Sequence, residues 1–287
     1  MPEGMDVFRD GVAVITGGGS GIGRGLACLA AEQGMRVVVA DIDVARARGV
    51  VTEIEGAGGE ALAVHVDVGD ANSVDALARA THDHFGDVRL LVNNAGIETL
   101  GFSWELDAAV WDRTLNINIH GAVHGVRAFA PRMLASGRPA WIANTASIGG
   151  LGIMPVQTSY IMSKHALIAF SECLYLEMQA KQAAVHVSAI LPGPVATRIF
   201  ADSHTGGDQG SCRHRDLMHG MLEADGISGE EAARRILPQI AAGEFWVSTH
   251  PDITREFAAN RARHLEALGM PSLPEETLAA MGISTSA

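Results

Sequence analysis

Short apolar runs alternate with longer segments of helical periodicity along most of this chain. The runs are rich in Val, Ile and Leu, and they are nearly continuous rather than apolar at every second position. A continuous run is typical of a strand covered on both faces, and helices between strands require parallel pairing through right-handed crossovers. The pattern predicts an α/β fold with a doubly wound parallel sheet flanked by helices. The seven expected strands cover residues 12–16, 36–41, 61–66, 90–93, 141–145, 185–191 and 245–248.

The segments between these runs carry helix signals of their own. Residues 73–85 follow Asn72, a residue type that caps helices, and residues 160–179 place Leu167, Phe170 and Leu174 on one face. Residues 197–228 break this order because Gly, His, Asp and Ser are frequent there, and we expect a mobile lid. We therefore expect a single domain over residues 1–250, followed by a helical extension and tail over residues 251–287.

Composition and charge argue against several classes of function. The 287 residues are 47% hydrophobic and 19% charged, which is enough apolar material for one large core. The formal net charge is -12 and the Lys and Arg residues are scattered, so no nucleic-acid partner is expected. No signal-peptide core is present at the start, and no apolar run approaches the ~18 residues of a membrane span. The sequence therefore predicts a cytoplasmic protein without a membrane partner.

A glycine-rich turn joins the first expected strand to the helix after it. This turn reads TGGGSGIG over residues 16–23. Glycines let the backbone approach a pyrophosphate, and the free amides at the start of the helix stabilise its charge. Asp41 ends the second strand, where a carboxylate can accept both adenosine ribose hydroxyls and would repel the 2′-phosphate of NADP. These features predict a site that prefers NAD, while Arg46 and Arg48, which could attract a 2′-phosphate, leave NADP as the less favoured alternative.

Three side chains with proton or hydrogen-bonding chemistry are expected at one edge of the sheet. Tyr160 and Lys164 stand four positions apart, so they share one face of a helix. A free phenol, with a pKa of about 10, is a poor base at neutral pH, and a neighbouring ammonium favours the phenolate. Ser147 follows the fifth strand, and ligands of open α/β folds bind at the carboxyl ends of strands. The three residues are therefore predicted to meet at one crevice.

Together these motifs resemble those of the short-chain dehydrogenase/reductase family over nearly all of residues 8–250. The chain departs from the commonest pattern at Ala146, where many members have a second Ser before the catalytic one. The resemblance implies a Rossmann-type catalytic domain and an NAD-dependent oxidoreductase that interconverts a secondary alcohol and its ketone. Further matching positions are Asp67 and Val68, the NNAG segment at residues 93–96, Asn118, and Pro192 and Gly193 with Thr197.

The same resemblance implies a role for each candidate residue. Tyr160 would be the general acid/base, Ser147 would hydrogen-bond the developing oxyanion, and Lys164 would lower the pKa of Tyr160 and bind the nicotinamide ribose. Asn118 would anchor a water leading to Lys164, and Asn93 would steady the central strands. Residues 67–68 would hold the adenine, and residues 192, 193 and 197 would border the nicotinamide. The implied cofactor site comprises Gly17, Ser20, Gly21, Ile22, Gly23, Asp41, Ile42, Asp67, Val68, Asn94, Ala95, Gly96, Tyr160, Lys164, Pro192, Gly193, Val195 and Thr197.

Two other functions on the same fold are alternatives to a dehydrogenase. A catalytically silent NAD-binding regulatory protein would not need the intact set of Asn118, Ser147, Tyr160 and Lys164. A lyase or dehalogenase would not need the complete glycine loop or Asp41. Both alternatives therefore leave part of the pattern unexplained.

The substrate is expected to be a small molecule, largely apolar and aromatic or cyclic. Glu98 directly follows NNAGI and is expected to face the pocket, while Ile148, Leu151, Met154 and Gln157 flank the catalytic residues. The methionines at positions 154, 218 and 221 could adapt to a bulky ligand, although core filling is an equally good interpretation.

Metal chemistry is not expected, whereas self-association is. No Cys or carboxylate completes a set of metal ligands with the histidine pairs at positions 82 and 84 and at positions 120 and 124. Helices expected over residues 108–134 and 160–179 have apolar faces that would suit pairing between copies. By analogy with relatives, a homo-oligomer, dimer or tetramer, is predicted.

Overall fold

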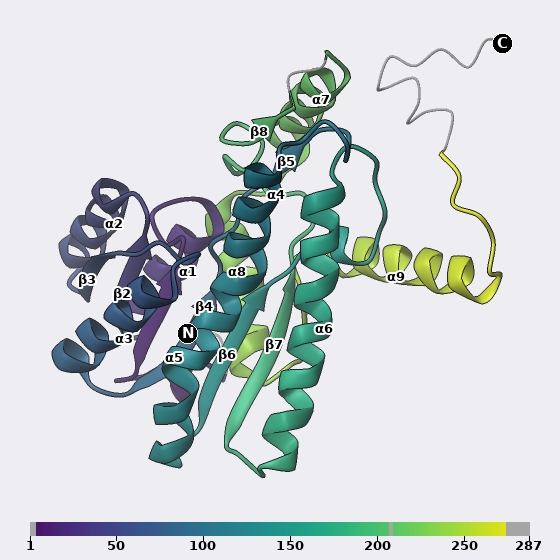
Figure 1. Cartoon of the computed structure of the whole chain (residues 1–287). Helices are drawn as coiled ribbons and strands as arrows, with labels where there is room; N and C mark the ends of the chain where they lie inside the picture. The colour runs from purple at the N-terminus through teal and green to yellow at the C-terminus, as the bar shows by residue number, and fades with distance from the viewer. Residues whose placement is uncertain (1–3, 207–208, 274–287) are drawn as a thin grey trace, which may run out of the picture.

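A parallel sheet forms the centre of the protein. The computed structural model describes residues 4–206 and 209–273. Its main sheet has the strand order β3-β2-β1-β4-β6-β7-β9, with all neighbours parallel (Figure 1). Every predicted strand is present to within about two residues, which confirms the doubly wound Rossmann-type fold. The strands are β1 (Val12–Thr16), β2 (Arg36–Asp41), β3 (Glu60–His65), β4 (Val88–Asn93), β6 (Ala140–Thr145), β7 (Val185–Leu191) and β9 (Trp246–Ser248).

Helices cover both faces of this sheet and bury alternate strand residues (Figure 1). Ala13 and Ile15 of β1 pack with α1, α2 and α8, whereas Val12 and Val14 pack with α3, α5 and α6. All four side chains are fully buried, which explains why the run is continuously apolar. The helices are α1 (Gly21–Glu32), α2 (Val44–Gly56), α3 (Ala71–Phe85), α5 (Gly121–Ser136), α6 (Thr158–Ala180) and α8 (Gly229–Ala241).

The predicted cap of the helix over residues 73–85 is wrong by two positions. Helix α3 begins at Ala71, and its N-cap is Asp70, whose Oδ1 accepts a hydrogen bond of 2.9 Å from the amide of Asn72. Asp and Asn cap helices about equally well, so residue type alone did not distinguish the two positions.

The helix predicted over residues 108–134 is divided by a wider turn. It consists of α4 (Ala108–Leu115), a π-helical turn η2 (Asn116–His120) and α5. Such turns are often found at functional sites, and this one contains Asn118. Gly125 of α5 lies against the Asn93 side chain, where a Cβ would overlap the amide. The helix can therefore approach the carboxyl end of β4 closely.

The remaining elements lie around the carboxyl edge of the sheet. The predicted lid contains β8 (His204–Thr205), which pairs with β5 (Thr99–Leu100), and α7 (Gln209–Asp225), at the top of Figure 1. After β9, α9 (Pro251–Glu266) extends outward without a buried residue. Residues 207–208 of the lid and 274–287 of the predicted tail lie outside the described residues. Within the described ranges, no helix is long and apolar enough to cross a membrane.

Candidate active site

A cleft of about 770 Å³ opens where the parallel strands end. The glycine loop after β1, the end of β2 and the loops after β3, β4, β6 and β7 all contribute to its walls. Three of the four predicted catalytic residues line it, namely Ser147, Tyr160 and Lys164, whereas Asn118 does not. Of the predicted cofactor residues, all line the cleft except Gly23. The structure thus brings nearly the whole predicted set to one place.

The glycine loop forms a cradle in which side chains would not fit. Gly17 and Gly21 have φ values of 61° and 51°, in the left-handed region that favours glycine. A Cβ on Gly17 would lie 2.9 Å from the Cα of Ala95, and one on Gly21 would lie 3.1 Å from Thr197 Cγ2. The amides of the first turn of α1 donate no hydrogen bond to the side chain of its N-cap, Ser20. The cradle therefore fits a pyrophosphate held by backbone amides.

Gly23 has a different position from the other loop glycines. It lies behind the loop, where a Cβ would overlap the carbonyl oxygen of Gly17 and would lie 2.6 Å from Asn94 Nδ2. Its absent side chain lets α1 pack directly on the loop. The structure thus places Gly23 in support of the cradle rather than in the cleft.

Asp41 places a carboxylate at the end of the cleft beside β2. The Asp41 carboxylate accepts hydrogen bonds of 2.9 Å from the amides of Gly19 and Asp43. Arg46 also lines this end, but its guanidinium pairs with Asp43 at 3.1 Å and with Asp202 at 3.7 Å. A 2′-phosphate would therefore meet one carboxylate and a cation that already has two anionic partners.

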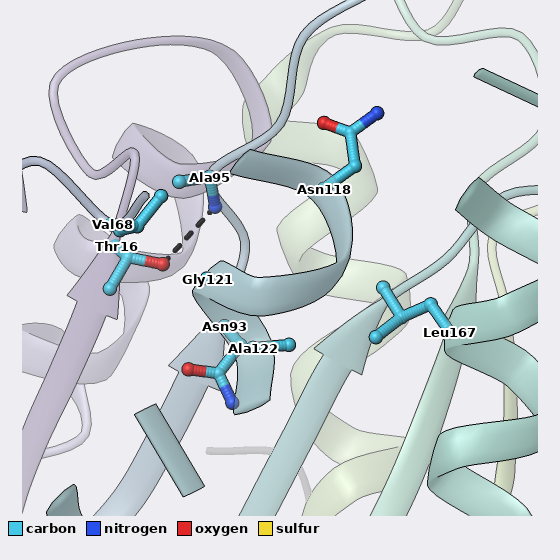
Figure 2. Close-up of a pocket in the computed structure, with 8 residues that line it drawn as sticks. All are labelled: Thr16, Val68, Asn93, Ala95, Asn118, Gly121, Ala122 and Leu167. Atoms are coloured by element: carbon cyan, nitrogen blue, oxygen red, sulfur yellow. Dashed lines mark hydrogen bonds between the residues drawn. The ribbon is translucent and has the colours of Figure 1, made fainter. Parts of the chain in front are cut away.

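Hydrogen bonds between neighbouring strands hold the NNAG segment beside this cradle. Figure 2 shows the Thr16 hydroxyl directed at the amide of Ala95, from which it accepts a bond of 3.1 Å. The same hydroxyl accepts from the amide of Asn94 at 3.0 Å. Asn93 Nδ2 donates to Asn144 Oδ1 at 2.8 Å and so joins β4 to β6. These bonds fix the backbone that forms one wall of the cleft.

Ser147, Tyr160 and Lys164 form one connected group. Lys164 is 3% exposed, donates from Nζ to the carbonyl of Thr145 at 2.8 Å, and lies 5.4 Å from the centre of the Tyr160 ring. Ser147 Oγ accepts from the amide of Gly149 at 3.0 Å and is hydrogen-bonded to Tyr160. The i, i+4 spacing thus places the phenol and the ammonium side by side, as expected on one helix face.

Burial governs the ionisation of this group in the protein alone. It raises the pKa of Tyr160, the charge of Glu98 raises it further, and the hydrogen bond with Ser147 opposes both. Burial also lowers the pKa of Lys164 to about 8, against the attraction of Glu98. The expected lowering of the Tyr160 pKa by Lys164 is not found in the protein alone, where burial raises this pKa and the phenol stays protonated at neutral pH.

Asn118 lies behind the cleft and is 2% exposed. Its Oδ1 accepts from the amide of Ile97 at 2.8 Å, and its Nδ2 donates to the Ile97 carbonyl and to Ser163 Oγ at 2.9 and 3.0 Å. A Cβ on Gly96 would lie 3.3 Å from Asn118 Oδ1 and 3.4 Å from Lys164 Nζ. The side chains of Asn118 and Lys164 therefore lie on either side of Gly96. The role of Asn118 in anchoring a water stays a prediction.

The substrate end of the cleft is mostly apolar. Phe257 was not predicted; it comes from α9 and packs on Gly152, where a Cβ would lie 3.1 Å from its ring. Glu98 and Gln157 line the cleft as expected, whereas Leu151 and Met221 do not. No sequence signal indicated which surface α9 would contact. The apolar lining includes Ile148, Ile153, Met154, Ile161, Phe200, Met218, Leu222 and Phe257.

The histidines form no metal centre in the part of the chain that the structure describes. No group of three or more His, Cys, Asp or Glu side chains that could hold a metal ion occurs there. His120 instead bonds to Asn116 Oδ1 at 2.8 Å, and His124 to the carbonyl of Val68 at 3.0 Å.

Known proteins resemble this chain in sequence and in structure. Probable oxidoreductase EphD of Mycobacterium tuberculosis (strain ATCC 25618 / H37Rv) is 37% identical over 194 residues, which is 68% of this chain but 32% of that longer protein. Cyclohexanol dehydrogenase of Acinetobacter sp. (strain SE19) is 35% identical over 197 residues, or 68% of this chain and 77% of the relative. A crystal structure of a short chain dehydrogenase/reductase from Burkholderia phymatum in complex with NAD matches with a TM-score of 0.88 and 33% identity, over 93% of this chain and 98% of that one.

The match to a protein family covers most of the chain. The sequence profile of the short chain dehydrogenase family matches residues 11–207, from the start of β1 to the lid. The chain belongs to the short-chain dehydrogenase/reductase family of oxidoreductases.

Proposed function

We propose that this protein is an NAD-dependent oxidoreductase that interconverts a hydrophobic secondary alcohol and its ketone. The observation that carries the proposal is the convergence of Ser147, Tyr160 and Lys164 in the cleft that also holds the glycine cradle. A hydroxyl, a phenol and an ammonium at the edge of a dinucleotide site suit alcohol oxidation, because one proton and one hydride must leave the substrate.

The cofactor would lie along the cradle. Gly17, Gly21 and the first-turn amides of α1 would hold the pyrophosphate, Asp41 would accept the adenosine ribose hydroxyls, and Lys164 would bind the nicotinamide ribose. When bound, NAD supplies the acceptor for the hydride that leaves the carbinol carbon. The net reaction converts the alcohol and NAD into the ketone, the reduced cofactor and one released proton.

The chain's own groups would handle the proton and the substrate oxygen. Ser147 Oγ accepts from Gly149 and interacts with Tyr160 in the protein alone, and its hydroxyl proton would be donated to the substrate oxygen once the substrate is bound. Tyr160 would remove the alcohol proton and return it in the reverse direction. Because burial keeps the phenol protonated, it needs nearby positive charge to act as a base, and Lys164 is placed to supply part of it.

NAD is proposed over NADP because of the charges at the adenosine end. Asp41 would accept hydrogen bonds from two ribose hydroxyls but would repel a 2′-phosphate. Arg46 already forms ion pairs with Asp43 and Asp202, so it would attract a 2′-phosphate only weakly.

A hydrophobic, cyclic or aromatic substrate is proposed from the apolar end of the cleft. Ile148, Met154, Phe200 and Phe257 come from three separate segments and line the same cleft as the catalytic group. The relationship to a cyclohexanol dehydrogenase supports a cyclic alcohol, and the small molecule is the partner we propose.

Helix α6 exposes apolar side chains that could pair with a second copy of the chain. Met162 and Leu176 of α6 are 44% and 61% exposed, which supports the proposed homo-oligomer through this helix. Light scattering after gel filtration would measure the assembly. The cytoplasmic location stays a prediction.

The experiment that tests the proposed function is a turnover assay with purified protein. NAD or NADP would be mixed with aliphatic, cyclic and aromatic secondary alcohols, and reduced nicotinamide would be followed by absorbance. We expect turnover of cyclic or aromatic alcohols with NAD. Binding of NAD without turnover of any alcohol would instead support the silent regulatory protein.

A further inference from the structure

A carboxyl group lies buried in the cleft without a task in the proposed reaction. Glu98 is 2% exposed and lines the cleft together with Tyr160 and Lys164. Removing a carboxyl group from water is costly unless hydrogen bonds compensate it. An apolar side chain at this position would match the apolar lining of the cleft better. The presence of a carboxyl group here therefore needs an explanation.

Two donors satisfy the oxygens of Glu98 only in part. The amide of Thr99 donates to Oε1 at 3.1 Å, and Gln157 Nε2 donates to Oε2 at 3.2 Å. Gln157 is itself 6% exposed and also lines the cleft. Among the described residues, no hydrogen bond links Gln157 Oε1 to a donor or the Glu98 carboxyl to an acceptor. The pair can therefore still offer one acceptor and, when Glu98 is neutral, one donor to a molecule in the cleft.

The ionisation of Glu98 narrows the ligand chemistry. Burial raises the pKa of Glu98 well above its ordinary value, while Thr99, Lys164 and Gln157 oppose this effect. A neutral acid donates a hydrogen bond, and a carboxylate only accepts. A ligand ammonium would require the carboxylate and a ligand ketone would require the acid, but a hydroxyl suits both forms because it donates and accepts.

Glu98 and Gln157 lie close to the residue at which the alcohol would react. Gln157 lies at the N-terminal end of α6, directly before Thr158, and Tyr160 lies in the first turn. When it is ionised, Glu98 is close enough to raise the pKa of both Tyr160 and Lys164. A polar group held by Glu98 and Gln157 would therefore belong to the same small substrate whose carbinol lies at Tyr160.

The geometry points to a hydroxyl-recognition subsite formed by Glu98 and Gln157, which selects a secondary alcohol that carries a second hydroxyl on an otherwise apolar ring or chain. The inference rests on the proposed function, since the first hydroxyl is the one that is oxidised. A substrate without the second hydroxyl would leave the buried pair without its remaining partners, and such a loss penalises binding strongly.

The test compares cyclohexanol with the cyclohexanediol isomers as substrates for the wild type and four variants, one of which is Gln157→Leu. In the wild type, we expect at least one diol to exceed cyclohexanol in kcat/KM by about tenfold or more. Glu98→Leu should lower this preference by about tenfold, mainly by raising KM for the diol. Glu98→Gln keeps a donor and an acceptor, so it should retain most of the preference. Thr114→Val is the matched control, because Thr114 is a buried residue that bonds Thr99 but does not line the cleft.

A binding measurement separates this inference from the proposed function. The Tyr160→Phe variant with saturating NAD would be titrated calorimetrically with cyclohexanol and the same diols, with and without the added Glu98→Leu change. Tighter binding of a diol that depends on Glu98 would support the subsite even if the wild type oxidised none of these alcohols. Turnover with every diol within about threefold of cyclohexanol, or a preference that survives in both Glu98→Leu and Gln157→Leu, would overturn it. If Glu98→Leu does not fold, the diol preference and diol affinity of Gln157→Leu provide the test.

Discussion

The carboxylate of Asp41 accepts a hydrogen bond of 2.9 Å from the amide of Gly19, which fixes the acidic end of β2 against the glycine loop that follows β1. Asp41 is 9% exposed, yet it lines the cleft. The contact thus joins the two parts of the chain that would hold the pyrophosphate and the adenosine ribose of a dinucleotide.

The first prediction concerns cofactor choice. Replacing Asp41 by Ala removes both the acceptor for the ribose hydroxyls and the repulsion of a 2′-phosphate. The ratio of kcat/KM for NAD to that for NADP should fall by about tenfold or more. Asp75→Ala makes the same change in charge at an exposed pair with Arg127, and it should leave the ratio unchanged. An unaltered ratio in Asp41→Ala would contradict the assignment of this carboxylate.

The second prediction concerns the support of the glycine loop. A Cβ at residue 23 would overlap the carbonyl of Gly17, so Gly23→Ala must displace the loop or α1. We expect the free energy of unfolding to fall by about 1–3 kcal/mol and the affinity for NAD to fall with it. Gly49→Ala is the control, because its Cβ would meet nothing within 4 Å on the exposed side of α2. That change should raise stability by up to about 1 kcal/mol. Chemical denaturation and calorimetric titration with NAD measure both effects, and equal behaviour of the two variants would refute the packing argument.

The central sheet could be predicted from sequence because a buried strand is apolar along its own length. Strands β1, β2, β4, β6 and β7 are buried along nearly their whole length, so a continuous apolar run marks each of them without knowledge of its neighbours. The proximity of Tyr160 and Lys164 in the cleft was predictable for a similar reason, since the two residues share a helix face. Helix α7 also left a signal, because Leu217, Met218, Met221 and Leu222 have helical spacing within the expected lid.

Features that depend on distant contacts were not predictable in this way. The π-helical turn places Asn118 against Ile97 and Ser163, which lie in other segments of the chain. The pairing of β5 with β8 joins residues about a hundred positions apart, and each strand is only two residues long. Phe257 lines the cleft only because α9 packs on Gly152. None of these partners can be identified from local periodicity.

The third prediction concerns the stability of the buried ammonium. Lys164 has an unfolded-state pKa near 10.5 and a folded-state pKa of about 8, so the unfolded chain binds more protons between these values. The free energy of unfolding should therefore rise from pH 8 to pH 10.5 through this group, by at most about 3 kcal/mol. Lys164→Met should remove this rise, whereas Lys181→Met, at an exposed site, should retain it. Denaturation across this pH range provides the measurement, and the same slope in Lys164→Met and the wild type would contradict the account.

The central claim is that Tyr160 transfers the proton during hydride exchange with a secondary alcohol. The chain has two tyrosines, and the other, Tyr175, packs against Phe245 with ring centres 5.2 Å apart. The most direct measurement is the single-turnover rate of NAD reduction by the best cyclic alcohol in Tyr160→Phe and in Tyr175→Phe, with NAD affinity measured in parallel. We predict a loss of about 10²-fold or more in Tyr160→Phe with NAD affinity retained, and a nearly unchanged rate in Tyr175→Phe. A Tyr160→Phe variant that reduces NAD as fast as Tyr175→Phe would contradict the account.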